Sequence, residues 1–106
     1  MNDNIREAAK ALKKSRFTTA FTGAGISVES GIPSFRGSGG LWEKYDPKVL
    51  DLDHFIQDPA SSWVVIKEIF YDFFGAAKPN KAHQVLAHLE REGMLGLTIT
   101  QNIDNL

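Results

Sequence analysis

The sequence feature that most constrains the fold is the clustering of glycine. Six of the nine glycines lie within residues 23–40, directly after the β-branched and aromatic run FTTAFT at residues 17–22. A short run of this kind that is closed by glycine is typical of a β-strand. Irregular segments as long as residues 23–40 are usually functional or mobile when they occur inside compact domains. We therefore predict a strand at residues 17–22, followed by a functional loop with one helical turn at residues 26–29.

The rest of the chain carries helical patterns and a second strand. Apolar residues recur at helical spacing in residues 2–14, 61–74 and 81–92, and LGLTIT at residues 95–100 has the composition of a strand. The order helix, strand, glycine-rich loop, helices, strand is typical of an α/β fold with a parallel sheet. Because a sheet of two strands is marginal in water, and because the sequence ends soon after the second strand, we expect a fragment of a larger domain.

Capping residues indicate where the helices begin and end. Asn2 or Asp3 can cap the first helix, and Asn80 can cap the third. Gly75 follows the second helix and Gly93 follows the third, positions at which glycine commonly ends a helix.

Composition argues against several classes of protein. The formal net charge of −1 gives no electrostatic reason to expect a nucleic acid or an anionic membrane as partner. No apolar run approaches the roughly 18 residues of a membrane-spanning helix, and the first residues lack the apolar core of a secretory signal. The absence of cysteine excludes disulfides and thiolate metal sites within this sequence. We therefore expect a cytoplasmic protein.

The predicted loop begins with GAGIS at residues 23–27, directly after the first predicted strand. Glycines at such a place let the backbone approach a pyrophosphate, and the turn that follows offers free N–H groups. The spacing is not the G-x-G-x-x-G of dinucleotide folds, because the next glycine is Gly31. Taken alone, the motif fits a tight strand-to-helix turn as well as a nucleotide site.

Two further segments point to the same place. GIPSFRG at residues 31–37 puts Phe35 and Arg36 on a loop, where an aromatic ring can cover a nicotinamide and a guanidinium can meet a phosphate. TQNID at residues 100–104 gathers polar side chains at the end of the second predicted strand. Open α/β sheets bind their ligands at the carboxyl ends of the strands. We therefore predict that the three segments meet at one cofactor site.

Together these segments resemble the sirtuins, the NAD-dependent protein deacylases. The resemblance covers residues 16–106 and rests on GAGIS-x-ES-GIP-x-FRG, on AKPN-x-AH at residues 77–83, and on TQNID. The sequence looks most like the compact prokaryotic type, to whose cofactor loop GLWEKY at residues 40–45 is also similar.

The resemblance implies a fold and a domain arrangement. The implied fold is α/β, with a partial Rossmann-like parallel sheet formed by residues 1–30 and 77–106. Residues 31–76 would form an inserted cofactor-binding loop and a small helical module. On this interpretation residues 1–106 are an incomplete catalytic domain.

The resemblance also implies which residues bind NAD. The residues implied around its pyrophosphate are Gly23, Ala24, Gly25, Ser27 and Val28. Phe35 would shield the nicotinamide ribose and discourage nicotinamide from rebinding. Arg36 would lie near the phosphates and help to order the cofactor loop.

On the nicotinamide side the implied residues follow the second strand. Gln101 and Asn102 would contact the ribose, and Asn102 would also order a water molecule. Ile103 and Asp104 would bind the carboxamide, because its N–H groups can donate hydrogen bonds to a carboxylate. Asn102 and Asp104 are thus the supporting residues that the resemblance assigns to catalysis.

The sequence also departs from the sirtuin pattern. Ser34 stands where many sirtuins carry an acidic residue or threonine, which puts the contacts of the nicotinamide pocket in doubt. The family's catalytic histidine, its four zinc-ligand cysteines and its acyl-lysine groove would lie beyond Leu106. We therefore expect zinc only in the parent enzyme, and no deacylase turnover by this chain alone.

The histidines and acidic residues away from these motifs have simpler interpretations. His83 and His88 are five residues apart, so they do not share a helix face as a zinc-binding pair would. His83 belongs to the AKPN-x-AH run, which looks like a packing element at a helix start. His54 fits a helix edge or solvated position, and Asp51 and Asp53 fit a solvated acidic stretch.

The function implied by the resemblance is the NAD-binding part of a protein-lysine deacetylase, which transfers the acyl group to ADP-ribose and releases nicotinamide. Its partner would be an acyl-lysine protein or peptide. Some sirtuins use an arginine–tyrosine pair to bind long acidic acyl groups, and no such pair is visible in residues 63–74. Deacetylation is therefore favoured over desuccinylation. Two alternatives remain: a non-catalytic NAD or ADP-ribose binding module, and an ADP-ribosyl transferase or NAD hydrolase on the same scaffold. Self-association or a companion fragment would cover the unfinished sheet.

Overall fold

Two parallel strands organise the molecule. In the computed structural model, which describes residues 2–106, β1 (Thr19–Thr22) pairs with β2 (Leu97–Thr100) in parallel, with Thr19 opposite Leu97. The parallel pairing confirms the prediction made from the order of elements. Both strands are two residues shorter at their N-terminal ends than predicted.

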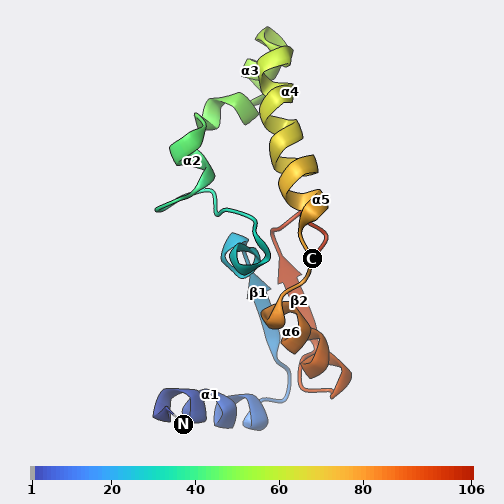
Figure 1. Ribbon diagram of the computed structural model, residues 1–106. Coiled ribbons are helices and arrows are strands. Elements are labelled where there is room, and N and C mark those ends of the chain that lie inside the picture. Colours follow the sequence, from blue (N-terminus) through green and yellow to red (C-terminus); the bar gives the residue numbers. More distant parts are fainter. Residues whose placement is uncertain (1) are drawn as a thin grey trace.

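The helix α1 (Asp3–Lys14) lies across the N-terminal ends of the strands, at the foot of the view in Figure 1. Its N-cap is Asn2, whose side chain accepts a hydrogen bond from the Asn4 N–H at 2.8 Å. Asn2 rather than Asp3 is therefore the cap of the helix. None of its residues is buried, so its apolar face, which includes Ile5, is open.

The helix α6 (Lys81–Arg91) lies beside the strands (Figure 1). Its side chains share a hollow with Thr22, Thr98 and Thr100. Asn80 caps its start, and Gly93 follows its end with φ = 74°, as the sequence predicted.

The face of the sheet that points away from α6 is apolar and exposed. Phe21 is 71% exposed, and Leu97 and Ile99 are 49% and 45% exposed. No described segment covers these three side chains.

A helical module, defined here as residues 41–76, lies beyond the C-terminal ends of the strands (Figure 1). Its elements are α2 (Leu41–Lys44), the 3-10 turn η2 (Pro47–Leu50), α3 (Leu52–Gln57), α4 (Pro59–Lys67), the π-helical turn η3 (Glu68–Phe73) and α5 (Phe74–Ala76). Its core is formed by Leu41, Val65 and Ile69, against which Phe70, Phe73 and Phe74 pack. Phe70, Phe73 and Phe74 of the apolar pattern at residues 61–74 therefore pack against the core, whereas Trp63 of the same pattern is 54% exposed.

The elements α4, η3 and α5 follow one another without a gap and form one long helix, whose boundaries differ from the predicted residues 61–74. It begins at Pro59, because Asp58 caps it by accepting from the Ser61 N–H and because proline suits a first helical turn. Gly75 does not end it, since α5 extends to Ala76. The predicted pattern also gave no sign that residues 68–73 depart from α-helical geometry.

The arrangement is elongated, with extents of 53 × 25 × 24 Å and a radius of gyration of 17.5 Å. A compact domain of this length would have a radius of gyration of about 13 Å. Residues 23–40 connect β1 to the module, and residues 77–80 connect the module to α6. The candidate site lies among the segments that follow β1 and β2. No helix within residues 2–106 has the length and apolar character needed to cross a bilayer.

Candidate functional site

The segments that follow the two strands meet at the C-terminal edge of the sheet. After β1 the chain turns at Gly23 into the 3-10 helix η1 (Ala24–Ser30), which the sequence predicted only as a single turn at residues 26–29. After β2 the chain continues as residues 101–106. Asn102 Nδ2 donates to the Gly23 carbonyl oxygen at 2.8 Å, and the Gln101 N–H donates to the Thr22 carbonyl oxygen at 3.3 Å. The GAGIS and QNID motifs are therefore in direct contact.

Asp104 is a buried carboxylate held by two donors. It is 8% exposed, and its neighbour Ser27 is 1% exposed. Ser27 Oγ donates to Asp104 Oδ2 at 2.5 Å, and the Leu106 N–H donates to Asp104 Oδ1 at 3.0 Å. Each oxygen of a carboxylate can accept more than one hydrogen bond. The carboxylate is thus fixed in orientation and keeps acceptor capacity for a ligand.

Gly23 leaves room for the side-chain amide of Gln101. A Cβ added to Gly23 would lie 2.7 Å from Gln101 Nε2, closer than real Cβ contacts. Any side chain at this position would displace the Gln101 amide. Gly25 differs, because nothing lies within 4 Å of the Cβ position there. Its backbone is therefore open to close approach by a ligand.

A small cavity of about 160 Å³ lies between these segments and the helical module. Its wall is mostly apolar, with the polar groups of residues 101–104 and Ser27 gathered on one side. The lining residues are Ala24, Ser27, Ile32, Pro33, Phe35, Leu41, Phe74, Gln101, Asn102, Ile103 and Asp104. An apolar wall with a few convergent polar groups is typical of a small-molecule site.

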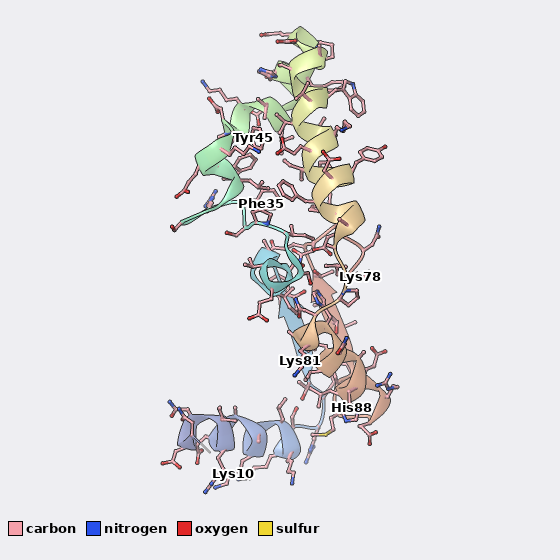
Figure 2. The ribbon with its side chains drawn as sticks, viewed as in Figure 1. Lys10, Phe35, Tyr45, Lys78, Lys81 and His88 are labelled. Atoms are coloured by element: carbon pink, nitrogen blue, oxygen red, sulfur yellow. The ribbon has the colours of Figure 1, made fainter. Side chains whose placement is uncertain are left out.

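The loop at residues 31–40 closes one side of this cavity. Figure 2 shows Phe35 between the end of the sheet and the helical module. The Phe35 ring lies 5.4 Å from the Trp42 ring, centroid to centroid, and the Trp42 N–H donates to the Phe35 carbonyl oxygen at 2.9 Å. Ser34 Oγ donates to the Arg36 carbonyl oxygen at 2.8 Å. Ser34 therefore supports the backbone of the loop, and its side chain does not line the cavity.

Arg36 lies outside the cavity, in a wider open groove beside it. This groove, about 490 Å³ in volume, is lined by Ala24, Ser34, Phe35, Arg36, Gln101 and Asn102. It shares Ala24, Phe35, Gln101 and Asn102 with the cavity. The site thus has a small apolar cavity lined by the Asp104 carboxylate, next to an open groove lined by the Arg36 guanidinium.

Asn80 ties the turn after β1 to the start of α6. Its Oδ1 accepts from the Ala82 N–H at 2.9 Å as a helix cap, while its Nδ2 donates to the Ile26 carbonyl oxygen at 2.7 Å and to Ser30 Oγ at 3.0 Å. The Asn80 N–H in turn donates to His83 Nδ1 at 3.2 Å, which completes a capping box. His83 is therefore a packing element at a helix start, as predicted.

Most of the predicted site residues come together here. Ala24, Ser27, Phe35, Gln101, Asn102, Ile103 and Asp104 line the cavity, and Arg36 lines the groove. Gly23 contributes its carbonyl oxygen to Asn102. Val28 is 46% exposed and lines neither space. The sequence prediction missed Ile32, Pro33, Leu41 and Phe74, for which the only signal was apolar character.

The other histidines and acids do not form a metal site. Within residues 2–106 no group of three His, Asp or Glu side chains is placed to hold a metal ion. His54, predicted at a helix edge or in solvent, is half-buried in α3, and its Nδ1 lies 2.9 Å from Oγ of the buried Ser62. None of the three histidines lines the cavity.

Comparison with known proteins identifies close relatives. The model of the Sir2 family matches residues 23–106. NAD-dependent protein deacylase 2 of Archaeoglobus fulgidus is 50% identical over 107 residues, a match that covers 100% of this chain and 42% of the relative. The NAD-dependent protein deacetylase of Caldivirga maquilingensis is 52% identical over 101 residues, covering 95% of this chain and 39% of the relative. The chain therefore spans about two fifths of the length of these curated relatives.

Solved structures give the same result for the fold. A Sir2 protein bound to deacetylated p53 peptide and 3′-O-acetyl ADP-ribose superimposes with a TM-score of 0.90 at 45% identity, covering 96% of this chain and 41% of that one. A complex of Sir2 with p53 peptide and NAD+ superimposes with a TM-score of 0.84 at 42% identity, covering 100% of this chain and 40% of that one. At these identities and scores the two strands, the glycine-rich turn and the helical module are those of the Sir2 fold.

Proposed function

The chain belongs to the Sir2 family, and from this premise we propose that it is the part of an NAD-dependent protein-lysine deacetylase that holds the nicotinamide end of NAD. The observation that carries the proposal is the buried Asp104 carboxylate, which the GAGIS motif holds through Ser27 in a small apolar cavity. Its relatives are NAD-dependent deacylases and deacetylases.

The cavity and groove have the chemistry that NAD requires. An aromatic amide fits an apolar chamber that has one fixed carboxylate, because the amide N–H groups can donate to Asp104 while the ring contacts apolar side chains. The guanidinium of Arg36 in the adjoining groove suits phosphate oxygens. The open backbone at Gly25 leaves room for a pyrophosphate. In this proposal Ile103 and Asp104 hold the carboxamide, and Gln101 and Asn102 contact the ribose.

Bound NAD supplies the ribose carbon that accepts the acyl group as nicotinamide leaves. The residues of this chain bind and orient it: Phe35 covers the chamber and excludes water, and Asp104 selects the orientation of the carboxamide. The proton transfers of the reaction need a base close to the ribose. No histidine of residues 2–106 lines the cavity. We therefore assign the base, the zinc site and the acyl-lysine groove to the remainder of the parent domain.

A non-catalytic function is the second candidate for this chain by itself. The cavity has the features needed to bind a ligand, but its lining contains no histidine and no lysine that could act as a base at neutral pH. The chain alone then binds NAD or ADP-ribose without turning it over. An acyl-lysine peptide, such as the p53 peptide held by its structural neighbours, would bind only to the completed domain.

Calorimetric titration of the purified chain with NAD tests the proposal. We expect saturable binding of one NAD per chain, weaker binding of nicotinamide, and no NAD-dependent loss of acetyl groups from an acetyl-lysine peptide. Mass spectrometry of the peptide measures the last point. The absence of NAD binding by a chain that circular dichroism shows to be folded would contradict the proposal. Deacetylation by the chain alone would show that it contains a base.

Replacing Asn80 by aspartate is expected to weaken NAD binding about three- to tenfold without loss of α6. Aspartate keeps the oxygen that caps the helix, but it cannot donate to the Ile26 carbonyl oxygen or to Ser30 Oγ. The turn that carries GAGIS then loses a tether worth about 1 kcal/mol, which corresponds to roughly a fivefold change. Calorimetry measures the affinity and circular dichroism measures the helix.

The replacement of Lys81 by alanine is the matched control, because it alters the neighbouring exposed residue and leaves both tether bonds in place. Its NAD affinity should equal that of the unchanged chain. If the aspartate variant lost helix and affinity together, Asn80 would act through the cap and not through the tether.

A further inference from the structure

The π-helical turn η3 ends directly before Phe74, a residue of the cavity wall. The Phe74 N–H donates to the Ile69 carbonyl oxygen, five residues earlier, instead of the four-residue spacing of an α-helix. Ile69 is fully buried in the core of the helical module and anchors this bond. In a regular α-helix the partner of Ile69 would be Phe73. Phe74, the residue that follows this turn, lines the cavity, and Phe73 does not.

Phe74 lies between two hollows. It lines both the cavity of about 160 Å³ and a second, open hollow of about 470 Å³. The only residues that line both are Phe74, Ile103 and Asp104. About half of the wall of the second hollow is apolar, and this half includes Phe70, Ala77 and Pro79. Phe74 is the one shared residue that lies outside the QNID motif.

The Phe74 ring is held in this position by packing. It meets the Phe70 ring edge to face, with centroids 5.2 Å apart and an interplanar angle of 85°. The ring also packs against the core of Leu41, Val65 and Ile69. A ring fixed from two sides forms a rigid wall and not a mobile gate.

We propose that Phe74 is the size-limiting residue of the cavity: its ring separates the cavity from the second hollow and so excludes aromatic amides whose ring carries an additional apolar group. This inference rests on the proposed function, because it takes the occupant to be the nicotinamide end of NAD. Removing the ring joins the two hollows. Nicotinamide derivatives with an apolar chain on the ring then extend the chain past Ile103 toward Phe70 and Pro79.

The experiment compares the unchanged chain with Phe74→Ala and Phe73→Ala. Phe73 is the matched control, because it is also half-buried and packs against the same core but lines neither hollow. The probes are nicotinamide and a set of nicotinamides that carry a butyl group at each free ring carbon. Affinities are measured by calorimetry or by ligand-observed NMR, and folding by circular dichroism.

We expect the unchanged chain and Phe73→Ala to bind nicotinamide and to bind every butyl derivative at least about tenfold more weakly. Phe74→Ala should bind at least one butyl derivative about tenfold more tightly than the unchanged chain does, since the buried chain of carbon atoms leaves water. Equal exclusion of the derivatives by Phe74→Ala would overturn the proposal. A gain by Phe73→Ala of the same size would also overturn it.

Two further measurements keep the inference testable in every case. If Phe74→Ala does not fold, Phe74→Leu replaces it with methyl derivatives as probes, and the same gain is expected. If the unchanged chain binds neither NAD nor nicotinamide, the proposed function fails, while the position of Phe74 is still tested by NMR. Nuclear Overhauser contacts between the Phe74 ring and Ile103 are expected, and their absence would overturn the inference.

Discussion

Replacing Asp104 by asparagine is expected to weaken the binding of NAD about ten- to a hundredfold while the chain stays folded. The two oxygens of the carboxylate accept from Ser27 Oγ and from the Leu106 N–H. Asparagine has only one acceptor oxygen, so either Ser27 or Leu106 would face an amide N–H instead. Hydrogen bonds to a charged group contribute about 1.5–3 kcal/mol, and each 1.4 kcal/mol is roughly a tenfold change in affinity. Calorimetric titration with NAD measures the loss.

Two variants separate the causes of this loss. Asp53→Asn removes a negative charge from an exposed position in α3, away from the cavity, and should leave the affinity unchanged. Ser27→Ala removes only the donor to Asp104 and should weaken binding less than Asp104→Asn does. An Asp104→Asn chain that bound NAD within about twofold of the unchanged affinity would show that the carboxylate does not contact the cofactor.

Replacing Ile69 by alanine is expected to lower the free energy of unfolding of the helical module by about 2–5 kcal/mol. Ile69 is the only apolar side chain of the described residues with no exposed surface, and it joins Leu41 and Val65 in the core of the module. The cavity that the substitution leaves has few neighbours able to fill it, because the module is small. Urea denaturation followed by tryptophan fluorescence measures the change, since Trp42 packs against this core.

Ile56→Ala provides the comparison for Ile69→Ala. Ile56 is 68% exposed in α3, and its replacement should change the free energy of unfolding by no more than about 0.5 kcal/mol. If both variants lost the same stability, the core assigned to Leu41, Val65 and Ile69 would not be what holds the module together. The Ile69→Ala chain should also lose affinity for nicotinamide, because Phe74, which lines the cavity, packs against the core that contains Ile69.

Local sequence patterns were sufficient to predict the frame of the fold. The strands, α1 and α6 each carry their own signal, as a β-branched run or an apolar period with a capping residue such as Asn80. The short elements α2, η2 and α3 were not predicted. Each has six residues or fewer, which is less than two helical turns and too short to establish a period. The π-helical turn was not predicted either, because the aromatic spacing there also fits an α-helix.

The site was predictable in its polar half only. Gln101, Asn102 and Asp104 stand together after a strand, so their place at the sheet edge follows from the strand itself. The apolar half depends on how the helical module packs against the loop. Leu41 and Phe74 look like ordinary core residues in the sequence, and both also line the cavity. The Asn80 tether depends on the position of α6 relative to η1, which no local pattern encodes.

The register of the two strands has a consequence for the order in which the molecule acquires its structure. Thr19 is paired with Leu97, so partners in the sheet lie 78 positions apart along the chain. Closing a loop of that length costs about 4 kcal/mol of chain entropy, and pairings so distant in sequence form slowly. On the ribosome, α1 and the helical module can form from nearby residues, whereas β1 must wait until β2 has been synthesised. The sheet and the cofactor site are therefore completed in the same late step, and a nascent chain that stops before Leu97 has neither.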